Sequence, residues 1–329
     1  MRKLGWLVLA LVVAACADRA SAQIRATAAA SKPGTHLITL GTIAGPASRA
    51  RRAQSSNLLI VNGALYVVDA GDGVARRLAE AGINIRDIGT VFITHHHDDH
   101  TAGLGTLMSV AWDQQRTDPI NVYGPPGTEA LVKAAVQYFT LSSSLRIRDG
   151  GRTVPIARVF VGHDRGVGMV YQDANIRVTA VENTHFQFHE TGPASANEKS
   201  YSYRFDTPDR VIVFTGDTGP SDAVTDLGRG ADLLVSEVNS FDARMQEMIQ
   251  DGRWQVMTDK ERAGIKTQAA RGHLTPEDVG KMAARAGVKT VALTHLTFTP
   301  NEADYSAWAD EVRKWFRGRV IVAEDLMEF

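Results

Sequence analysis

Four histidines and two aspartates stand together in residues 94–100, written THHHDDH. On an extended chain, residues two apart point the same way, so His95 and His97 are expected to face one ion. The chain then turns into a helix, where Asp99 and His100 are expected to face a second point nearby. Imidazole nitrogen and carboxylate oxygen are ligands that suit zinc. The run therefore predicts a metal site.

The position of this run supports the same interpretation. It directly follows the apolar residues VFI, and polar groups beside a core cost several kcal/mol when they are left unpaired. Metal binding is therefore favoured over a merely polar surface. His96 alternates away from its neighbours, so it is expected to be exposed or to support the ligands rather than to be one.

Further ligands must come from later in the chain, because one loop cannot close two metal sites. Three residues follow hydrophobic runs: His185 after VTAVENT, Asp217 after RVIVFTG and His295 after KTVALT. These runs are expected strands, whose ends would bring the three side chains to one edge of a sheet. His189 competes with His185, but it lies past the expected strand end, so His185 is favoured.

Short β-branched runs alternate with helical patterns along the chain. Strands are predicted at 36–42, 57–63, 64–71, 88–94, 175–185, 200–205, 210–217, 231–238 and 289–296, and helices at 73–82, 101–115, 276–287 and 303–316. Asn62-Gly63 is expected to form a hairpin turn, and 149–153 and 193–199 are expected to be loops. This order, with no low-complexity linker, predicts a layered α/β structure in one domain at 23–329.

The first 22 residues have the three-part layout of a secretory signal. Arg2 and Lys3 form a basic start, 4–15 an apolar run too short to span a bilayer permanently, and Ala20-Ser21-Ala22 an A-x-A end. Cleavage after Ala22 is favoured. The alternative is a lipoprotein signal, in which a lipidated Cys16 becomes the mature N-terminus. An exported protein is expected, periplasmic or secreted, with a lipid anchor in the alternative case.

The mature chain is expected to be slightly acidic. Without 1–22 it keeps 33 Lys and Arg against 36 Asp and Glu, a net charge of −3. That total does not indicate a basic face for nucleic acid, although short basic runs stand at 48–52 and 146–148. Cys16 is the only cysteine, so no internal disulfide is expected and the core must supply the stability.

The stretches THHHDDHTAGL, FTGDT and LTHL resemble the motifs of the metallo-β-lactamase superfamily. The resemblance covers nearly the whole mature chain and implies an α/β fold, the four-layer αβ/βα sandwich, with a binuclear zinc site at one edge of its two sheets. It implies one metal held by His95, His97 and His185, a second held by Asp99, His100 and His295, and a bridge between them from Asp217. Mn²⁺ and Fe²⁺ are also compatible with these ligand types.

Two more stretches, LGT…R…SSNLLI and RGHLTPEDVGKMAARAG, are similar to the ribonuclease Z and zinc-dependent arylsulfatase branch. His273 matches a catalytic histidine of that branch, and Glu237 stands where the family has an acid that hydrogen-bonds it. The resemblance implies that His273 is a general acid and that Asp99 orients or deprotonates the attacking water. The alternatives are a helix-capping loop residue for His273 and a solvated strand-end acid for Glu237.

These features favour an exported binuclear zinc hydrolase that cleaves small phosphodiesters or aryl sulfate esters by metal-activated water. The alternative is a ribonuclease Z-like endonuclease. The export signal, the acidic total and the lack of an obvious long Gly/Pro-rich, basic arm argue against it. Lactone, thioester or β-lactam hydrolysis stays open, as do an iron oxidoreductase on the same fold and a metal-binding protein without activity.

The expected partner is a small-molecule ester. Nucleic acid is disfavoured, a membrane is expected only through a lipidated Cys16, and a homodimer is allowed. The loop that holds Phe186, Phe188 and His189 is expected at the mouth of the site, either against an aromatic leaving group or packed on its own side chains.

Overall fold

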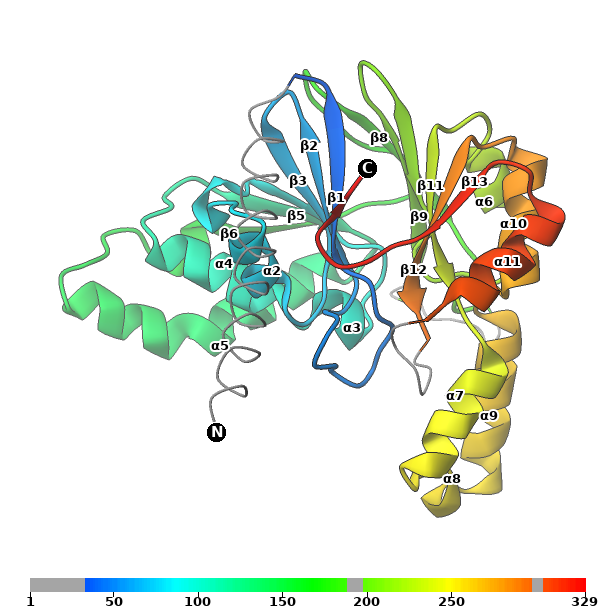
Figure 1. Cartoon of the computed structure of the whole chain (residues 1–329). Coiled ribbons are helices and arrows are strands. Elements are labelled where there is room, and N and C mark those ends of the chain that lie inside the picture. The colour runs from blue at the N-terminus through cyan, green and yellow to red at the C-terminus, as the bar shows by residue number, and fades with distance from the viewer. Residues whose placement is uncertain (1–32, 188–197, 298–303) are drawn as a thin grey trace, which may run out of the picture.

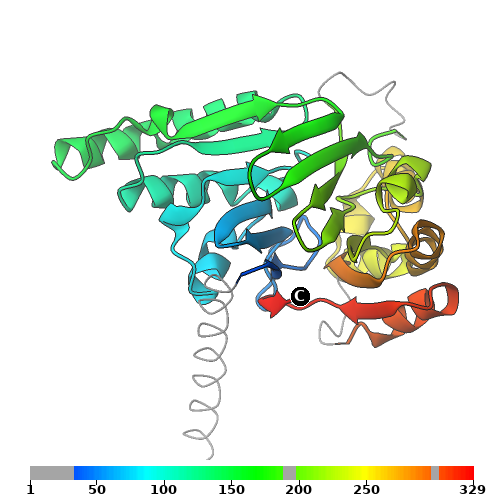
Figure 2. The ribbon, with the colours of Figure 1, turned by 90° about the horizontal axis from the view of Figure 1, so that it is seen from above.

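Two seven-stranded sheets pack face to face, and helices cover both outer faces (Figure 1). The computed structural model describes residues 33–187, 198–297 and 304–329. Seen from above, the two sheets and their outer helices form separate layers (Figure 2). The four-layer sandwich predicted from the sequence is therefore confirmed.

The first sheet has the order β14-β1-β2-β3-β4-β5-β6. Its strands are β1 (Thr35–Gly41), β2 (Ser56–Val61), β3 (Ala64–Ala70), β4 (Thr90–Phe92), β5 (Ile120–Gly124), β6 (Phe160–Asp164) and β14 (Met327–Glu328). Its outer face carries α2 (Val74–Glu80), α4 (Leu104–Asp113) and α5 (Thr128–Arg148), with the short helices η1 (Ile85–Asp87), α3 (Asp98–Thr101) and η2 (Ile156–Arg158) between elements.

The second sheet has the order β13-β12-β11-β10-β9-β8-β7. Its strands are β7 (Gly168–Gln172), β8 (Arg177–Glu182), β9 (Tyr201–Asp206), β10 (Val211–Phe214), β11 (Leu233–Val238), β12 (Thr290–Leu296) and β13 (Arg319–Val322). Its outer face carries α6 (Asp222–Leu227), α10 (Pro276–Ala286) and α11 (Ser306–Trp315).

The hydrophobic core has three parts, one between the sheets and one under each helical layer. Between the sheets, Phe92 of β4 packs edge-on against Phe205 of β9, with ring centroids 5.2 Å apart. The hydroxyl of Tyr203, also on β9, donates to the carbonyl of Ile93 at 2.8 Å. These contacts fix the end of β4, from which THHHDDH continues, against the opposite sheet.

The predicted hairpin at Asn62-Gly63 is confirmed. Both residues have positive φ, 50° and 84°, and Val61 pairs with Ala64 across them. This is the geometry that a two-residue turn needs to match the twist of its strands.

Two of the expected strands end earlier than predicted. β8 ends at Glu182 and β10 at Phe214, so His185 and Asp217 lie in the segments that follow rather than at strand ends. Gly216 takes φ +56, which leads the chain out of the β10 ladder. The helix predicted at 101–115 is present but shorter, because α4 begins at Leu104 and ends at Asp113, after a break that follows α3.

A helical arm that the sequence analysis did not predict projects from the second half of the sandwich (Figure 1). It consists of α7 (Phe241–Gln250), α8 (Arg253–Val256) and α9 (Asp259–Arg271). The arm buries little, only Met248 on α7 and Ala269 on α9, so its apolar periodicity is weak. The long helix α5 was missed for the same reason.

Capping signals for the arm are nevertheless present in the sequence. The Ser240 side chain accepts a hydrogen bond from the backbone of Ala243, and Thr258 forms a capping box with Glu261. These two signals mark the starts of α7 and α9.

Within the described ranges, no helix has the length and apolar character needed to cross a membrane. The proposed signal at 1–22, including Cys16, lies outside the described residues, as does most of the expected loop at 193–199.

Tyr203→Phe is expected to lower the free energy of unfolding by about 1–3 kcal/mol, because the buried carbonyl of Ile93 loses its donor. The measurement is Tm by circular dichroism, with an expected fall of roughly 2–10 °C. Tyr138→Phe is the matched control, since that side chain is 81% exposed on α5. An equal Tm for Tyr203→Phe and wild type would contradict this account of how the end of β4 is held.

Candidate metal centre

The loop after β4 brings its histidines to the edge where the two sheets meet. His95 is fully buried and His100 is 2% exposed, whereas His97 and His96 are half-buried. The Nε2 atom of His96 lies 3.0 Å from Thr128 Oγ1, on the side of α5. His96 therefore points away from the other three, as its alternation in the sequence predicts.

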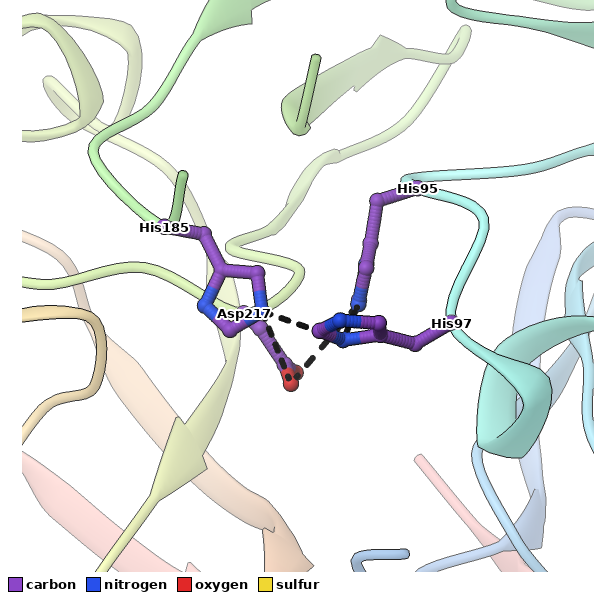
Figure 3. Close-up of side chains that lie close together, drawn as sticks. All are labelled: His95, His97, His185 and Asp217. Atoms are coloured by element: carbon purple, nitrogen blue, oxygen red, sulfur yellow. Dashed lines mark hydrogen bonds and ion pairs between the residues drawn. The ribbon is translucent and has the colours of Figure 1, made fainter. Parts of the chain in front are cut away.

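A first group of possible ligands is formed by His95, His97, His185 and Asp217 (Figure 3). His97 Nδ1 lies 3.1 Å from His95 Nε2 and 3.2 Å from His185 Nε2. Asp217 Oδ2 lies 3.9 Å from His95 Nε2 and 4.0 Å from His185 Nε2. A tetrahedral zinc ion with bonds of about 2.0–2.1 Å holds its ligand atoms about 3.3 Å apart, so these spacings suit one ion.

A second group is formed by Asp99, His100 and His295. His295 Nε2 lies 3.1 Å from Asp99 Oδ2, and His100 Nε2 lies 3.8 Å from the same oxygen. Asp217 also reaches this group, because its Oδ2 is 3.2 Å from His295 Nε2 and its Oδ1 is 3.3 Å from His100 Nε2. Asp217 thus lies between the two groups, where the resemblance places a bridging ligand.

The backbone on either side of the site has two unusual features. A Cβ on Gly216 would lie 2.8 Å from the carbonyl oxygen of Tyr201, so only glycine fits directly before Asp217. His295 has φ +46, and the β11–β12 register skips this residue. Such a bulge re-aims a side chain, and a strained non-glycine residue of this kind is typical of functional sites.

Hydrogen bonds from the surrounding chain orient the ligand nitrogens. His185 Nδ1 donates to the carbonyl of Gly272 at 2.7 Å, and His100 Nδ1 donates to Asp69 Oδ2 at 2.9 Å. Thr94 Oγ1, which donates to the Asp69 carboxylate, lies 3.1 Å from His95 Nδ1. In each ring the other nitrogen, Nε2, is left as an acceptor toward the centre, which is the arrangement of metal-binding histidines.

The charges at the site also fit a cation. Burial lowers the pKa of His95 and His185 well below the ordinary value, so both rings are neutral at pH 7 and offer lone pairs. Among the described residues, His100 Nε2 and Asp217 Oδ1 are buried with no partner in good hydrogen-bond geometry, although they lie 3.3 Å from each other. Burial alone would raise the pKa of Asp217, but the neighbouring His295 and His100 hold it well below the usual range. A divalent cation would satisfy these atoms, and the donor set of imidazole and carboxylate suits zinc.

His273 and Glu237 lie beside the two ligand groups and contact each other. His273 Nδ1 donates to Glu237 Oε2 at 2.6 Å, and His273 Nδ1 lies 3.9 Å from Asp217 Oδ2. Burial lowers the pKa of His273 to about 3 and raises that of Glu237 well above its usual value. Glu237 is 2% exposed, so the alternative of a solvated strand-end acid is wrong.

A cavity of about 210 Å³ opens in front of the ligand groups. Its walls include Asp99, Asp217, His273 and His295 from the sandwich and Arg244, Glu247, Met248, Arg253 and Gln268 from the arm. Gln268 joins the two walls, because its Oε1 accepts from Arg244 Nη1 at 3.0 Å and its Nε2 lies 3.2 Å from His273 Nε2. The arm is therefore part of the site.

The site residues that sequence reasoning missed include Asp69, Arg244 and Gln268. Asp69 carried a usable signal, since it is a lone acid at the end of the apolar run ALYVV, where a buried carboxylate needs partners. Arg244 and Gln268 had no comparable signal, because they stand on an arm that was not predicted.

The loop after His185 is only partly described. The ring of Phe186 lies 5.1 Å from that of His97 and 4.7 Å from that of His185, centroid to centroid, so it packs beside the first ligand group. The other two residues of interest there, Phe188 and His189, lie outside the described residues.

Asp69→Asn is expected to weaken metal binding about 10–100-fold, because an amide no longer holds the proton of His100 Nδ1 as a carboxylate does. The measurement is zinc affinity by competition with a chelator of known affinity. Asp173→Asn is the matched control, since Asp173 also accepts several hydrogen bonds but contacts Tyr66 and Tyr171 instead of the histidines. Equal zinc affinity in Asp69→Asn and wild type would show that Asp69 does not orient a ligand.

Comparison with known proteins relates this geometry to a family. A model of the beta-lactamase superfamily domain matches residues 65–296. A ribonuclease Z from Mycobacterium avium is 28% identical over 293 residues, which cover 88% of this chain and 96% of that protein. A ribonuclease Z from Methanothermobacter thermautotrophicus is 26% identical over 298 residues, which cover 78% of this chain and 85% of that protein.

Solved structures with the same fold agree. The metallo-beta-lactamase fold protein YhfI from Bacillus subtilis has a TM-score of 0.63 at 19% identity, covering 91% of this chain and 99% of its own. Human tRNase Z, short form, has a TM-score of 0.61 at 22% identity, and the match covers 89% of this chain and 98% of that protein. With the domain match over most of its length, the chain belongs to the metallo-β-lactamase superfamily of hydrolases and resembles its ribonuclease Z members.

Proposed function

We propose that the protein is an exported, two-metal hydrolase that cleaves small phosphodiesters, with aryl sulfate esters as the next substrate class. The observation that carries the proposal is the meeting of two ligand groups at Asp217, in the wall of a cavity that also presents the His273–Glu237 pair. Relatives named ribonuclease Z, an activity on phosphodiester bonds, support phosphorus as the attacked centre. Export rests on the signal layout of residues 1–22.

The two metals are proposed to be zinc, because imidazole nitrogen and carboxylate oxygen are donors that suit it. His95, His97 and His185 would hold one ion, Asp99, His100 and His295 the other, with Asp217 between. When bound, two such ions supply a hydroxide nucleophile at neutral pH and neutralise charge that develops on the attacked ester.

The chain's own residues have separable roles. Asp99 accepts a hydrogen bond from the backbone of Gly45 at 2.8 Å through Oδ2, which fixes its carboxylate at the cavity wall, where it can orient the attacking water. Glu237 holds the Nδ1 proton of His273, so Nε2 is the nitrogen that would reach the substrate once it gives up the amide of Gln268, 3.2 Å away. An anionic ester in the cavity would favour the protonated ring, which could then donate from Nε2 to the leaving oxygen.

The charge of the arm favours a small substrate over a nucleic acid. Residues 241–271 hold six Lys and Arg against five Asp and Glu, a nearly balanced set. A surface that grips a nucleic-acid backbone needs an excess of positive charge. A ribonuclease Z-like endonuclease is kept as the second candidate because the relatives at 26–28% identity carry that name.

Purified mature protein is expected to bind about two metal ions per chain and to hydrolyse bis-(p-nitrophenyl) phosphate faster than p-nitrophenyl sulfate. Asp217→Ala is expected to lose both metal and turnover, because that carboxylate belongs to both ligand groups. The measurements are metal content by mass spectrometry and p-nitrophenol release on the same samples. Two bound ions without turnover of either ester would overturn the substrate assignment.

The same protein tested on a transfer-RNA precursor separates the two candidates. A kcat/KM for the precursor far above that for bis-(p-nitrophenyl) phosphate would establish the endonuclease instead. Failure to cleave the precursor, with turnover of the small diester, is the result expected here.

His273→Ala is expected to reduce turnover of diphenyl phosphate about 10²–10⁴-fold but to affect bis-(p-nitrophenyl) phosphate much less, because p-nitrophenolate leaves without a proton. The measurement is kcat/KM for both esters. His163→Ala is the control, since His163 stacks on Tyr123 away from the cavity, with centroids 4.6 Å apart. An equal fall in kcat/KM for the two esters would contradict the general-acid role of His273.

A further inference from the structure

Arg244 places a positive charge in the wall of the cavity that the ligand groups also line. It stands on the arm helix α7, is half-buried, and lines the cavity together with Asp99, Asp217 and His273. Nothing in the metal-binding or general-acid roles described above uses this guanidinium. A cation buried beside a metal centre is costly unless an anion compensates it.

The hydrogen bond that Arg244 forms among the described residues uses only one nitrogen of its guanidinium group. Nη1 donates to Gln268 Oε1, a neutral acceptor. The nearby acid of the same wall, Glu247, is bound by Arg49 and by Arg253, the latter at 3.0 Å. In the part of the chain that the structure describes, no carboxylate forms an ion pair with Arg244. Asp99 and Asp217 attract it at longer range, but each is a proposed ligand whose charge a metal would offset.

The position of Arg244 is held firmly from several sides. Gln268 ties it to His273 at the floor of the cavity. The Arg49–Glu247 ion pair joins α7 to the loop after β1, the same loop whose Gly45 donates to Asp99. At the tip of the arm, Arg262 lies 5.4 Å from the centre of the Trp254 ring, so α8 and α9 also contact each other.

We propose that Arg244 is a substrate-binding residue that receives a non-bridging oxygen of an anionic phosphoryl or sulfuryl group, so that the site selects charged esters over neutral lactones, thioesters and β-lactams. This inference rests on the proposed ester hydrolysis and deepens it by naming the charge of the substrate. The planar fork of arginine matches two such oxygens at once, whereas a neutral carbonyl substrate offers no charge to meet it.

The inference can be tested with two ligands that have the same shape but differ in charge. Methyl(phenyl)phosphinate carries one negative charge and has no ester bond to cleave, and methyl phenyl sulfone is its neutral counterpart. Their Kd values for protein reconstituted with Zn²⁺ are measured by isothermal titration calorimetry, which needs no turnover. Wild type is expected to bind the phosphinate more tightly than the sulfone.

Arg244→Gln is expected to raise the Kd of the phosphinate about 10–100-fold and to leave that of the sulfone unchanged. Arg244→Lys keeps the charge but not the fork, so a smaller loss is expected, and this variant decides the question if Arg244→Gln does not fold. Arg285→Gln is the matched control, because Arg285 pairs with Asp222 on the surface of α10 and lies outside the cavity. It is expected to bind both ligands as wild type does.

A phosphinate Kd that is the same in wild type and the folded Arg244 variants would overturn the inference, as would wild type that prefers the sulfone. Failure of ester hydrolysis is a separate result. Arg244-dependent phosphinate binding without turnover of any ester would overturn the proposed function and leave the anion site standing. Turnover with an Arg244-independent Kd would overturn the anion site alone.

Discussion

The carboxylate of Asp217 is 2% exposed and lies within 4.0 Å of five imidazole rings. A buried charge of this kind is tolerated only where partners or a metal surround it, so the chain must deliver the rings from several separate segments to one point. The two sheets do this because the loop after β4 comes from one of them, and the segments after β8 and β10 come from the other (Figure 3). The unusual backbone conformations beside the site serve the same convergence of side chains on Asp217. Gly216 turns the chain sharply before Asp217, and the bulge at His295 aims that ring inward.

The histidines themselves are held by groups that do not face the centre. Asp69, Thr94 and the carbonyl of Gly272 each engage a ring nitrogen on the far side, and so decide which nitrogen is left for a cation. The segment that supplies Gly272 leads directly into His273, and the arm that precedes it supplies Gln268 and Arg244. Orientation of His185, placement of His273 and the charge of the cavity wall therefore depend on one stretch of chain between β11 and α10.

Much of the fold and many of the residues at the site could be predicted from the sequence. The features that could not be predicted were missed for physical reasons. The hairpin at Asn62-Gly63 and the strands with strong apolar runs were found because their signals are local. The arm was missed because a helix pair that buries only Met248 and Ala269 leaves little periodicity to detect. His185 and Asp217, which the sequence singled out, do come close to the other histidines, although the strands before them end sooner than the apolar runs suggest.

What the sequence by itself determined is the set of chemical groups: a dense cluster of imidazoles and carboxylates after an apolar run, and the motifs that mark the superfamily. Residue type and spacing are local properties, so they can be read from the sequence without knowledge of the fold. Only the tertiary structure decided which atoms converge, that Glu237 meets His273, that Asp69 supports His100, and that Arg244 lines the same cavity as the ligand groups. These are contacts between segments far apart in the chain, and their geometry is set by sheet packing and loop conformation rather than by any short stretch of residues.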